Sequence, residues 1–257
     1  MLLQDKVCVV VGAGSLRGIG CATAELFAEH GAKVVVVDLA MSDDLLRSIK
    51  SSIEERLQRS ASVHGFRCDI GNAEDCEKLA QDVVSLHGTI DCLVNSAAIV
   101  KSQPLLEISG KDLDTMLGVN LKGAFHLCQS FLKVFAPRNS GVIVNVASVA
   151  AQRGGGLVGG AHYAASKGGV ISLTRSIARE FGPMGIRANV ICPSMTETGM
   201  LDDTVSQDMH EQIVSAIPLR RAAKPREIAG ACLFLASELS AYVTGATIDV
   251  NGGSHIH

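Results

Sequence analysis

The stretch KVCVVVGAGSLRGIG, residues 6–20, joins a continuous apolar run to a glycine-rich turn. An apolar run without polar alternation is typical of a strand that is buried on both faces of a sheet. Helical periodicity follows in CATAELFAEHG (21–31), where Gly31 marks the end of the helix. This stretch therefore predicts a buried strand, a turn and a helix, which together begin a parallel α/β unit.

The same alternation of strand and helix continues along the chain. Further apolar runs cover residues 32–38, 63–69, 90–95, 141–146, 187–192 and 246–250, and a second helical segment, 73–88, ends on Gly88. Strands that alternate with helices form right-handed βαβ units, so we expect a parallel sheet covered by helices. Because the sequence shows no linker or repeat, we expect residues 1–257 to form one domain.

The composition limits the classes of partner. With 47% apolar residues, 19% charged residues and a net charge of -3, the chain is expected to be globular, without general affinity for nucleic acid or anionic membranes. The N-terminus lacks a signal-peptide pattern, and the apolar runs are shorter than the roughly 20 residues that span a bilayer. Eight cysteines without a Cys-x-x-Cys pair predict reduced, mostly buried thiols, with neither disulfides nor a metal site. We therefore expect a soluble cytoplasmic protein.

The turn GAGSLRGIG (12–20) has the spacing of a dinucleotide-binding loop. A pyrophosphate can approach the positive end of the following helix only where glycines leave the backbone open. Asp38 ends the next apolar run, 18 residues after Gly20, where a carboxylate can accept hydrogen bonds from both ribose hydroxyls. A carboxylate about 4 Å from a 2′-phosphate costs about 4 kcal/mol, more than the roughly 1 kcal/mol that exposed Arg17 would contribute. The sequence therefore predicts NAD(H) rather than NADP(H).

Further motifs in a fixed order give the chain a resemblance to a known family. They are CDI (68–70), NSAA (95–98), VNLKG (119–123), NVASVA (145–150), YAASK (163–167), ICPSMTETGM (191–200) and TGATIDVNGG (244–253). Together with the glycine turn, this set resembles the short-chain dehydrogenase/reductase family from end to end. The resemblance implies a Rossmann-type, doubly wound parallel sheet of seven strands, a nicotinamide cofactor, reversible oxidation of an alcohol, and a homotetramer.

The resemblance also assigns site residues by motif. The expected catalytic set is Asn120, Ser148, Tyr163 and Lys167. The expected cofactor-binding residues are Gly12, Arg17, Gly18, Ile19 and Gly20 in the turn, Asp38, Asp69, Ile70 and Asn95 around the adenosine, and Pro193, Thr196 and Thr198 near the nicotinamide, together with Tyr163 and Lys167. The backbone around Asn120 is expected to support a bound water that joins Lys167 to solvent as a proton path.

The spacing of Tyr163 and Lys167 explains how a phenol can move a proton. Positions four apart share one face of a helix, so the two side chains project together. Free tyrosine has a pKa of about 10, and an ammonium about 4 Å away favours the phenolate by up to about 4 kcal/mol. We therefore expect Lys167, together with the positive ring of oxidised nicotinamide, to lower the pKa of Tyr163 toward neutrality, and Ser148 to hold the substrate oxygen against the phenol. The adjacent His162 is expected to point off that face.

The substrate side is expected to consist of Ala150, Gln152, the glycine-rich loop 153–160 and the lid-like segment 194–213. Gln152, Arg153 and the acidic lid favour a small polar alcohol or ketone, such as a sugar, a polyol or a hydroxy acid. The main hypothesis is thus an NAD(H)-dependent oxidoreductase acting on such a molecule.

Two alternatives stay open. A 3-oxoacyl-carrier-protein reductase fits the overall resemblance, but Asp38 and the mild acidity argue against NADPH and a basic docking patch. A non-catalytic NAD(H)-binding regulator fits the altered NSAA motif and the pair Pro193-Ser194, but the reacting groups are intact. Turnover of an alcohol panel separates the regulator from an enzyme, because a binding protein has no rate to lose.

Overall fold

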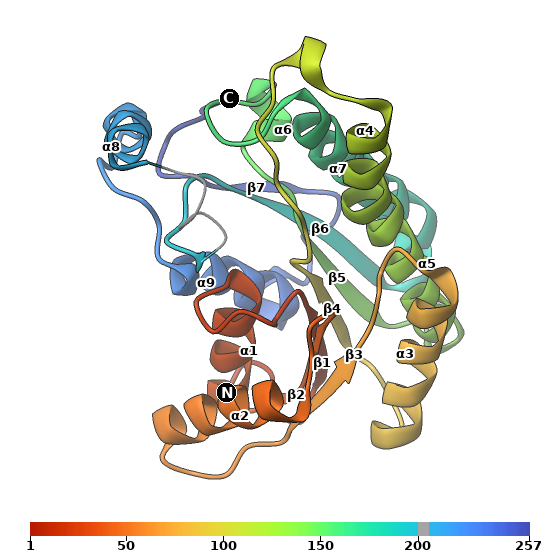
Figure 1. Cartoon of the computed structure of the whole chain (residues 1–257). Coiled ribbons are helices and arrows are strands. Elements are labelled where there is room, and N and C mark those ends of the chain that lie inside the picture. The colour runs from red at the N-terminus through yellow and green to blue at the C-terminus, as the bar shows by residue number, and fades with distance from the viewer. Residues whose placement is uncertain (200–205) are drawn as a thin grey trace.

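Parallel strands form the centre of the molecule. The computed structural model describes residues 1–199 and 206–257 (Figure 1). Within these ranges, seven strands make one parallel sheet in the order β3-β2-β1-β4-β5-β6-β7. The strands are β1 Val7–Val11, β2 Lys33–Asp38, β3 Val63–Arg67, β4 Cys92–Asn95, β5 Gly141–Val146, β6 Ile186–Pro193 and β7 Thr247–Val250. The predicted doubly wound Rossmann-type sheet is confirmed, and each strand ends within two residues of its apolar run.

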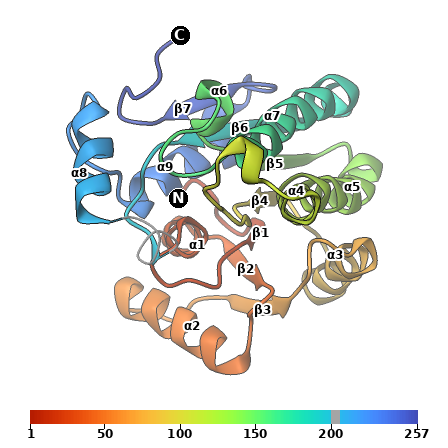
Figure 2. The same cartoon turned by 45° about the horizontal axis from the view of Figure 1, so that its top comes forward.

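Helices cover both faces of this sheet (Figure 2). They are α1 Ile19–Glu29, α2 Asp43–Leu57, α3 Ala73–His87, α4 Gly110–Leu117, α5 Ala124–Phe135, α6 Ala150–Arg153, α7 Ala161–Phe181, α8 Gln207–Ala216 and α9 Pro225–Ala236. The core under α1, α2 and α9 lies on one face, and the core under α3, α5 and α7 lies on the other. In the described ranges, none of the helices is long and apolar enough to cross a membrane.

The side chains of β1 show why the apolar runs are continuous. Cys8 and Val10 belong to the core beneath α1 and α9, whereas Val7, Val9 and Val11 belong to the core beneath α3 and α5. All five residues are buried. Because burying one valine contributes roughly 1.5–3 kcal/mol relative to exposure, a polar side chain on either face of this strand would be costly.

The strand order reverses beside β1. The chain proceeds outward from β1 to β2 and β3, and then returns to β4 on the opposite side of β1. Val11, Asn95 and Asn145 lie at one level of the sheet. The segments that follow these residues therefore leave the sheet together at its carboxyl edge, which is where ligands bind in doubly wound sheets.

Candidate active site

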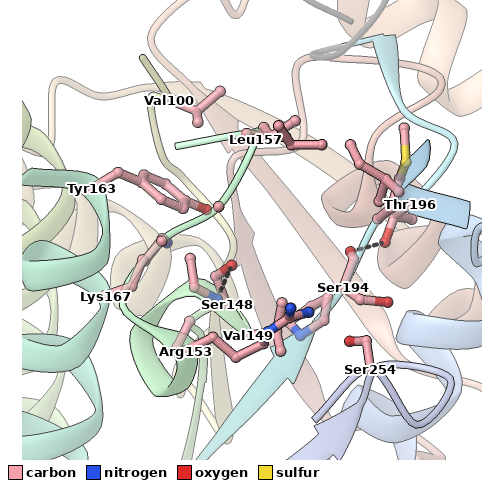
Figure 3. A pocket seen from close by; sticks show the side chains of 18 of the residues that line it. Val100, Ser148, Val149, Arg153, Leu157, Tyr163, Lys167, Ser194, Thr196 and Ser254 are labelled. Carbon is pink, nitrogen blue, oxygen red and sulfur yellow. Dashed lines mark hydrogen bonds between the residues drawn. The ribbon is translucent and has the colours of Figure 1, made fainter. Parts of the chain in front are cut away.

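A cavity of about 330 Å³ opens at this carboxyl edge (Figure 3). Its walls come from the segments after β4, β5 and β6, from α7 and α8, and from the C-terminal tail. Ser148, Tyr163 and Lys167 line it together, with Ser148 following β5 and the other two lying in the first turns of α7. The structure thus brings three of the four expected catalytic side chains to one place.

Lys167 lies at the base of the cavity. Its exposed fraction is 3%, its Nζ donates a hydrogen bond to the carbonyl oxygen of Val146 at 2.8 Å, and this nitrogen is 6.0 Å from the centroid of the Tyr163 ring. Burial disfavours the ammonium and lowers the pKa of Lys167 to about 8. The charge of this side chain therefore changes close to physiological pH.

The Tyr163 phenol behaves differently from the expectation based on its spacing. Burial raises the pKa of Tyr163 above its usual value, and a hydrogen bond with Ser148 offsets part of that rise. Within the protein alone, desolvation of the phenolate dominates, and the charge of Lys167 does not produce the expected lowering. The Lys167 ammonium is instead directed to the Val146 carbonyl. The Ser148 hydroxyl is held in place by the N–H of Ala150, which donates to it at 3.1 Å.

Asn120 lies behind this group in a turn of π-helix, Gly118–Gly123, between α4 and α5. Its Oδ1 accepts a hydrogen bond from the N–H of Ile99, and its Nδ2 donates to the carbonyl oxygen of the same residue, both at 2.9 Å. Nδ2 also donates to the hydroxyl of Ser166 at 3.1 Å. A π turn interrupts the regular helical ladder and is frequent at functional sites. Asparagine has a low helix propensity, but the hydrogen bonds of Asn120 here join α7, through Ser166, to the segment after β4, through Ile99.

The glycines of the turn let neighbouring segments of the protein approach it closely. Gly12 has a φ of +83°, and a Cβ on it would lie 2.5 Å from the backbone nitrogen of Ala97. A Cβ on Gly14 would lie 2.4 Å from the carboxyl carbon of Asp38. The Asp38 carboxylate accepts hydrogen bonds from the N–H groups of Gly14 at 2.8 Å and Ala40 at 3.0 Å. These bonds fix an acidic side chain beside the turn, as the prediction of a ribose-binding carboxylate requires.

The other predicted cofactor residues lie at the start of α1, in the lining of the cavity and after β3. Gly18 is the N-cap of α1, which also contains Ile19 and Gly20, and Arg17 is exposed on the turn. Ile19, Pro193, Thr196 and Thr198 line the cavity. Asp69 is exposed and accepts a hydrogen bond from the N–H of Gly71 at 2.9 Å, while Ile70 is buried against Gly123.

Asn95 is buried at the end of β4. Its exposed fraction is 4%, and its side chain bonds to Asn145 at 3.4 Å and to the N–H of Ala97 at 3.2 Å. In the described residues it does not line the cavity. Asn145 continues this buried polar chain by donating to the Thr174 hydroxyl at 2.9 Å. The sequence analysis missed Asn145 and Thr174, although an asparagine inside the apolar run 141–146 was a visible signal.

The glycine-rich loop is tied to the segment that follows β4. The N–H of Gly159 donates to the Ser102 hydroxyl at 2.9 Å, and this hydroxyl donates to the carbonyl oxygen of Leu157 at 3.3 Å. The N–H of Gly160 donates to the carbonyl oxygen of Lys101 at 3.1 Å. Leu157 lines the cavity, so Ser102 holds part of its rim, and the sequence analysis did not identify Ser102.

The predicted substrate side is partly corrected. In the described part of the chain, Ala150 and Arg153 line the cavity and Gln152 does not; the Gln152 Nε2 instead donates a hydrogen bond to Asp249 of β7 at 2.8 Å. The lid-like segment contributes residues on both sides of positions 200–205, which lie outside the described residues. His162 is buried and, as expected, does not line the cavity in the described part of the chain.

The eight cysteines are all free and buried. In the described residues no group of three or more His, Cys, Asp or Glu side chains is arranged to hold a metal ion. Burial raises the pKa of the Cys192 thiol, which lies near Lys167, to about 11, so this thiol is neutral at pH 7.

Known proteins resemble this chain over its whole length. A family model described as enoyl-(acyl carrier protein) reductase matches residues 12–255. The uncharacterized short-chain type dehydrogenase/reductase y4mP of Sinorhizobium fredii is 43% identical over 100% of both chains. The 3-oxoacyl-[acyl-carrier-protein] reductase FabG of Thermotoga maritima is 37% identical over 98% of this chain and 99% of its own. The crystal structure of levodione reductase is 32% identical, with a TM-score of 0.90 and 98% of each chain covered.

The chain therefore belongs to the short-chain dehydrogenase/reductase family. Its named relatives include reductases, so the chain is an oxidoreductase of a family that typically uses a nicotinamide cofactor. The fold and the order of the motifs agree with this assignment.

Proposed function

We propose that the protein transfers a hydride between NAD(H) and a small secondary alcohol or ketone. The observation that carries this proposal is the meeting of Ser148, Tyr163 and Lys167 in one cavity at the carboxyl edge of the sheet. A phenol, a hydroxyl and an amine at such a place are the groups that proton transfer to or from a carbonyl oxygen needs.

In this proposal Tyr163 is the acid and base. Its phenol gives a proton to the carbonyl oxygen during reduction and takes the hydroxyl proton during oxidation. The Ser148 hydroxyl, oriented by the N–H of Ala150, hydrogen-bonds the same substrate oxygen and holds it against the phenol. When bound, the nicotinamide supplies or accepts the hydride, and its oxidised form adds a positive charge.

Lys167 and Asn120 support the proton transfer. The pKa of Lys167, lowered to about 8 by burial, lets this amine exchange a proton near neutral pH. Asn120 fixes the segment after β4 and contacts Ser166 on α7, one residue before Lys167. We propose that the π turn around Asn120 marks the route by which the proton of Lys167 exchanges with solvent.

The glycine turn and Asp38 support binding of a dinucleotide. Gly12 and Gly14 let the turn pack closely against Ala97 and Asp38, and the Asp38 carboxylate lies at the end of β2. We propose that Asp38 accepts the ribose hydroxyls of NAD(H), and that Pro193, Thr196 and Thr198 face the carboxamide end.

Turnover of a panel of small alcohols and ketones, monitored through the absorbance of the nicotinamide, tests the proposal. Tyr163→Phe should lower kcat by roughly 100-fold or more, in line with the loss of a general acid. The matched control is Tyr242→Phe, because Tyr242, the other of the chain's two tyrosines, is fully exposed and should be dispensable. A chain that binds NAD(H) but oxidises or reduces nothing in the panel would instead be the regulator.

A second candidate is reduction of a 3-oxoacyl group on acyl-carrier protein. The observation in its favour is the 37% identity to a protein of that name. It predicts a preference for NADPH, which Asp38 opposes. Comparing a carrier-linked 3-oxoacyl thioester with a free ketone, each with NADH and NADPH, separates the two candidates.

Three further predictions belong to the same proposal. We expect the enzyme to act in the cytoplasm, to form a homotetramer, and to fold as one domain over residues 1–257. Size exclusion coupled to light scattering measures the molar mass of the protein at micromolar concentration and so tests the tetramer. A single cooperative unfolding transition would support the single domain.

A further inference from the structure

The substrate side of the cavity contains a cation that has no hydrogen-bond or ion-pair partner among the described residues. Arg153 ends α6, lines the cavity, and extends toward the wall that contains Ser194 and Ser254 (Figure 3). Within residues 1–199 and 206–257, its guanidinium makes no hydrogen bond or ion pair. Arg226, by contrast, is paired with Glu29 through two hydrogen bonds. Arg153 is therefore available to a ligand.

The remaining charges of the lining do not neutralise this guanidinium. Among the described residues that line the cavity, the charged side chains are Arg153 and Lys167, and none is Asp or Glu. Lys167 is already bonded to the Val146 carbonyl beneath Tyr163. The acidic lid expected from the sequence thus leaves no carboxylate on the described wall, and the cavity favours a negatively charged molecule.

A second donor faces the same space. The Ser254 hydroxyl is buried, lines the cavity, and has no hydrogen-bond partner among the described residues. The C-terminal tail that presents it is ordered by Asn251, which accepts the N–H of Gly253 at 2.8 Å and donates to the carbonyl oxygen of His255 at 3.0 Å. A buried hydroxyl without a partner costs about 1–3 kcal/mol, and a ligand oxygen that accepts its proton removes that cost.

The rest of the wall is apolar. Val100, Leu157, Val158 and Ile213 line the cavity alongside the polar groups near Tyr163. Such a surface stabilises aliphatic carbon by about 25 cal/mol for each Å² removed from water. A sugar or a polyol, with a hydroxyl on nearly every carbon, would leave these hydroxyls without partners against this wall.

We propose that the substrate is an aliphatic oxo acid or hydroxy acid whose carboxylate binds Arg153 and accepts a hydrogen bond from Ser254. The planar guanidinium can donate two parallel hydrogen bonds to a carboxylate, and one cation balances one negative charge. The aliphatic chain lies against the apolar wall while the reacting oxygen meets Ser148 and Tyr163. This inference deepens the proposed hydride transfer and rests on it.

The test compares 3-oxohexanoate with 3-oxohexanamide, which has the same length and no charge. We expect the wild type to prefer the acid in kcat/KM by roughly 10- to 100-fold, as a charge-assisted hydrogen bond provides. Arg153→Gln should remove this preference through KM for the acid, while its rate with the amide stays within about threefold of wild type, since that interaction involves only the carboxylate. Arg153→Lys should restore part of the preference, and Ser254→Ala should lower it severalfold.

The matched control is Arg179→Gln. Arg179 is exposed in the last turn of α7 and lies outside the lining of the cavity, so this variant should keep the preference for the acid. A second measurement needs no turnover. Hexanoate should raise the Tm of the wild type but not that of Arg153→Gln, whereas hexanamide should affect the Tm of the two proteins equally.

The outcomes separate the two proposals. Equal rates for acid and amide in both the wild type and Arg153→Gln would refute the carboxylate site and leave hydride transfer intact. The carboxylate site would also be refuted, with hydride transfer intact, if a neutral pantetheine thioester is the better substrate and its kcat/KM is unchanged in Arg153→Gln. If no ketone or alcohol reacts, but hexanoate stabilises the wild type and not Arg153→Gln, the proposed hydride transfer fails and the carboxylate site stands. If hexanoate stabilises both proteins equally, the carboxylate site is wrong.

Discussion

The Asp38 carboxylate should decide between NAD(H) and NADP(H), and replacing it by the isosteric amide tests this directly. In the structure, Asp38 is held at the end of β2 by the N–H groups of Gly14 at 2.8 Å and Ala40 at 3.0 Å. Because its position is fixed beside the glycine turn, it cannot swing away from a 2′-phosphate. Asp38→Asn keeps one acceptor oxygen and removes the negative charge.

The size of the effect follows from the charges. Two like charges about 4 Å apart near a protein surface repel by about 4 kcal/mol, which equals about three decades in affinity. Asp38 is half-buried, so solvent screens part of this repulsion. We therefore expect Asp38→Asn to raise the ratio of kcat/KM for NADP⁺ over NAD⁺ by roughly 10- to 1000-fold. The rise should shrink as salt is added, because the effect is electrostatic.

The assay measures initial rates with both cofactors at saturating alcohol, for the wild type, Asp38→Asn and Asp114→Asn. Asp114 is an exposed acid on α4 with the same charge, so it controls for a general change in net charge. A wild type that works better with NADP⁺, or an Asp38→Asn variant whose cofactor ratio stays within twofold of wild type, would refute the reasoning.

Three further predictions concern protonation and burial. Because burial raises the pKa of Tyr163, kcat/KM for alcohol oxidation should increase with pH on the alkaline side of neutrality, and a pH profile that is flat from 7 to 10 would contradict this. The pKa of Lys167 is about 8 in the folded protein and 10.5 in an unperturbed lysine, so the unfolded chain binds more protons between these values. Wild-type stability relative to Lys167→Met should therefore rise by about 3 kcal/mol between pH 7.5 and 10.5 in urea unfolding, and a constant difference would count against a buried, titrating amine. The buried thiols should react with a disulfide reagent only after unfolding, when eight are counted; fast reaction of any in the native protein would show that its burial is wrong.

The sequence predicted the sheet well for a physical reason. Strands buried on both faces must be apolar at every position, so they are visible as continuous runs in the sequence. The residues that meet in the cavity were assigned by the family motifs, and the spacing of Tyr163 and Lys167, four apart on one helix, explained why these two project together. Motifs and spacings are local patterns, and local patterns can be recognised without knowing the fold.

What the sequence did not reveal depends on distant contacts. Gln152 and Arg153 are neighbours, yet only Arg153 lines the cavity, because Gln152 bonds to Asp249, 97 residues away in the chain. The direction of the Tyr163 pKa shift depends on how much protein surrounds the ring, which spacing along a helix does not contain. Asn120, in the π turn, is bonded in the same way to Ile99, which lies 21 residues earlier in the segment after β4.

The stretch 99–102 is bonded on both sides, to Asn120 through the backbone of Ile99 and to the rim of the cavity through Ser102. A bulky molecule that pushes Leu157 outward must stretch or break the hydrogen bonds of Ser102. The displacement then reaches the backbone of Ile99, to which Asn120 is hydrogen-bonded. Under the proposed proton route beside Asn120, tolerance for large substrates and the rate of proton transfer are therefore expected to change together. Directed evolution toward a wider entrance should lose turnover unless residues 99–102 are rebuilt at the same time.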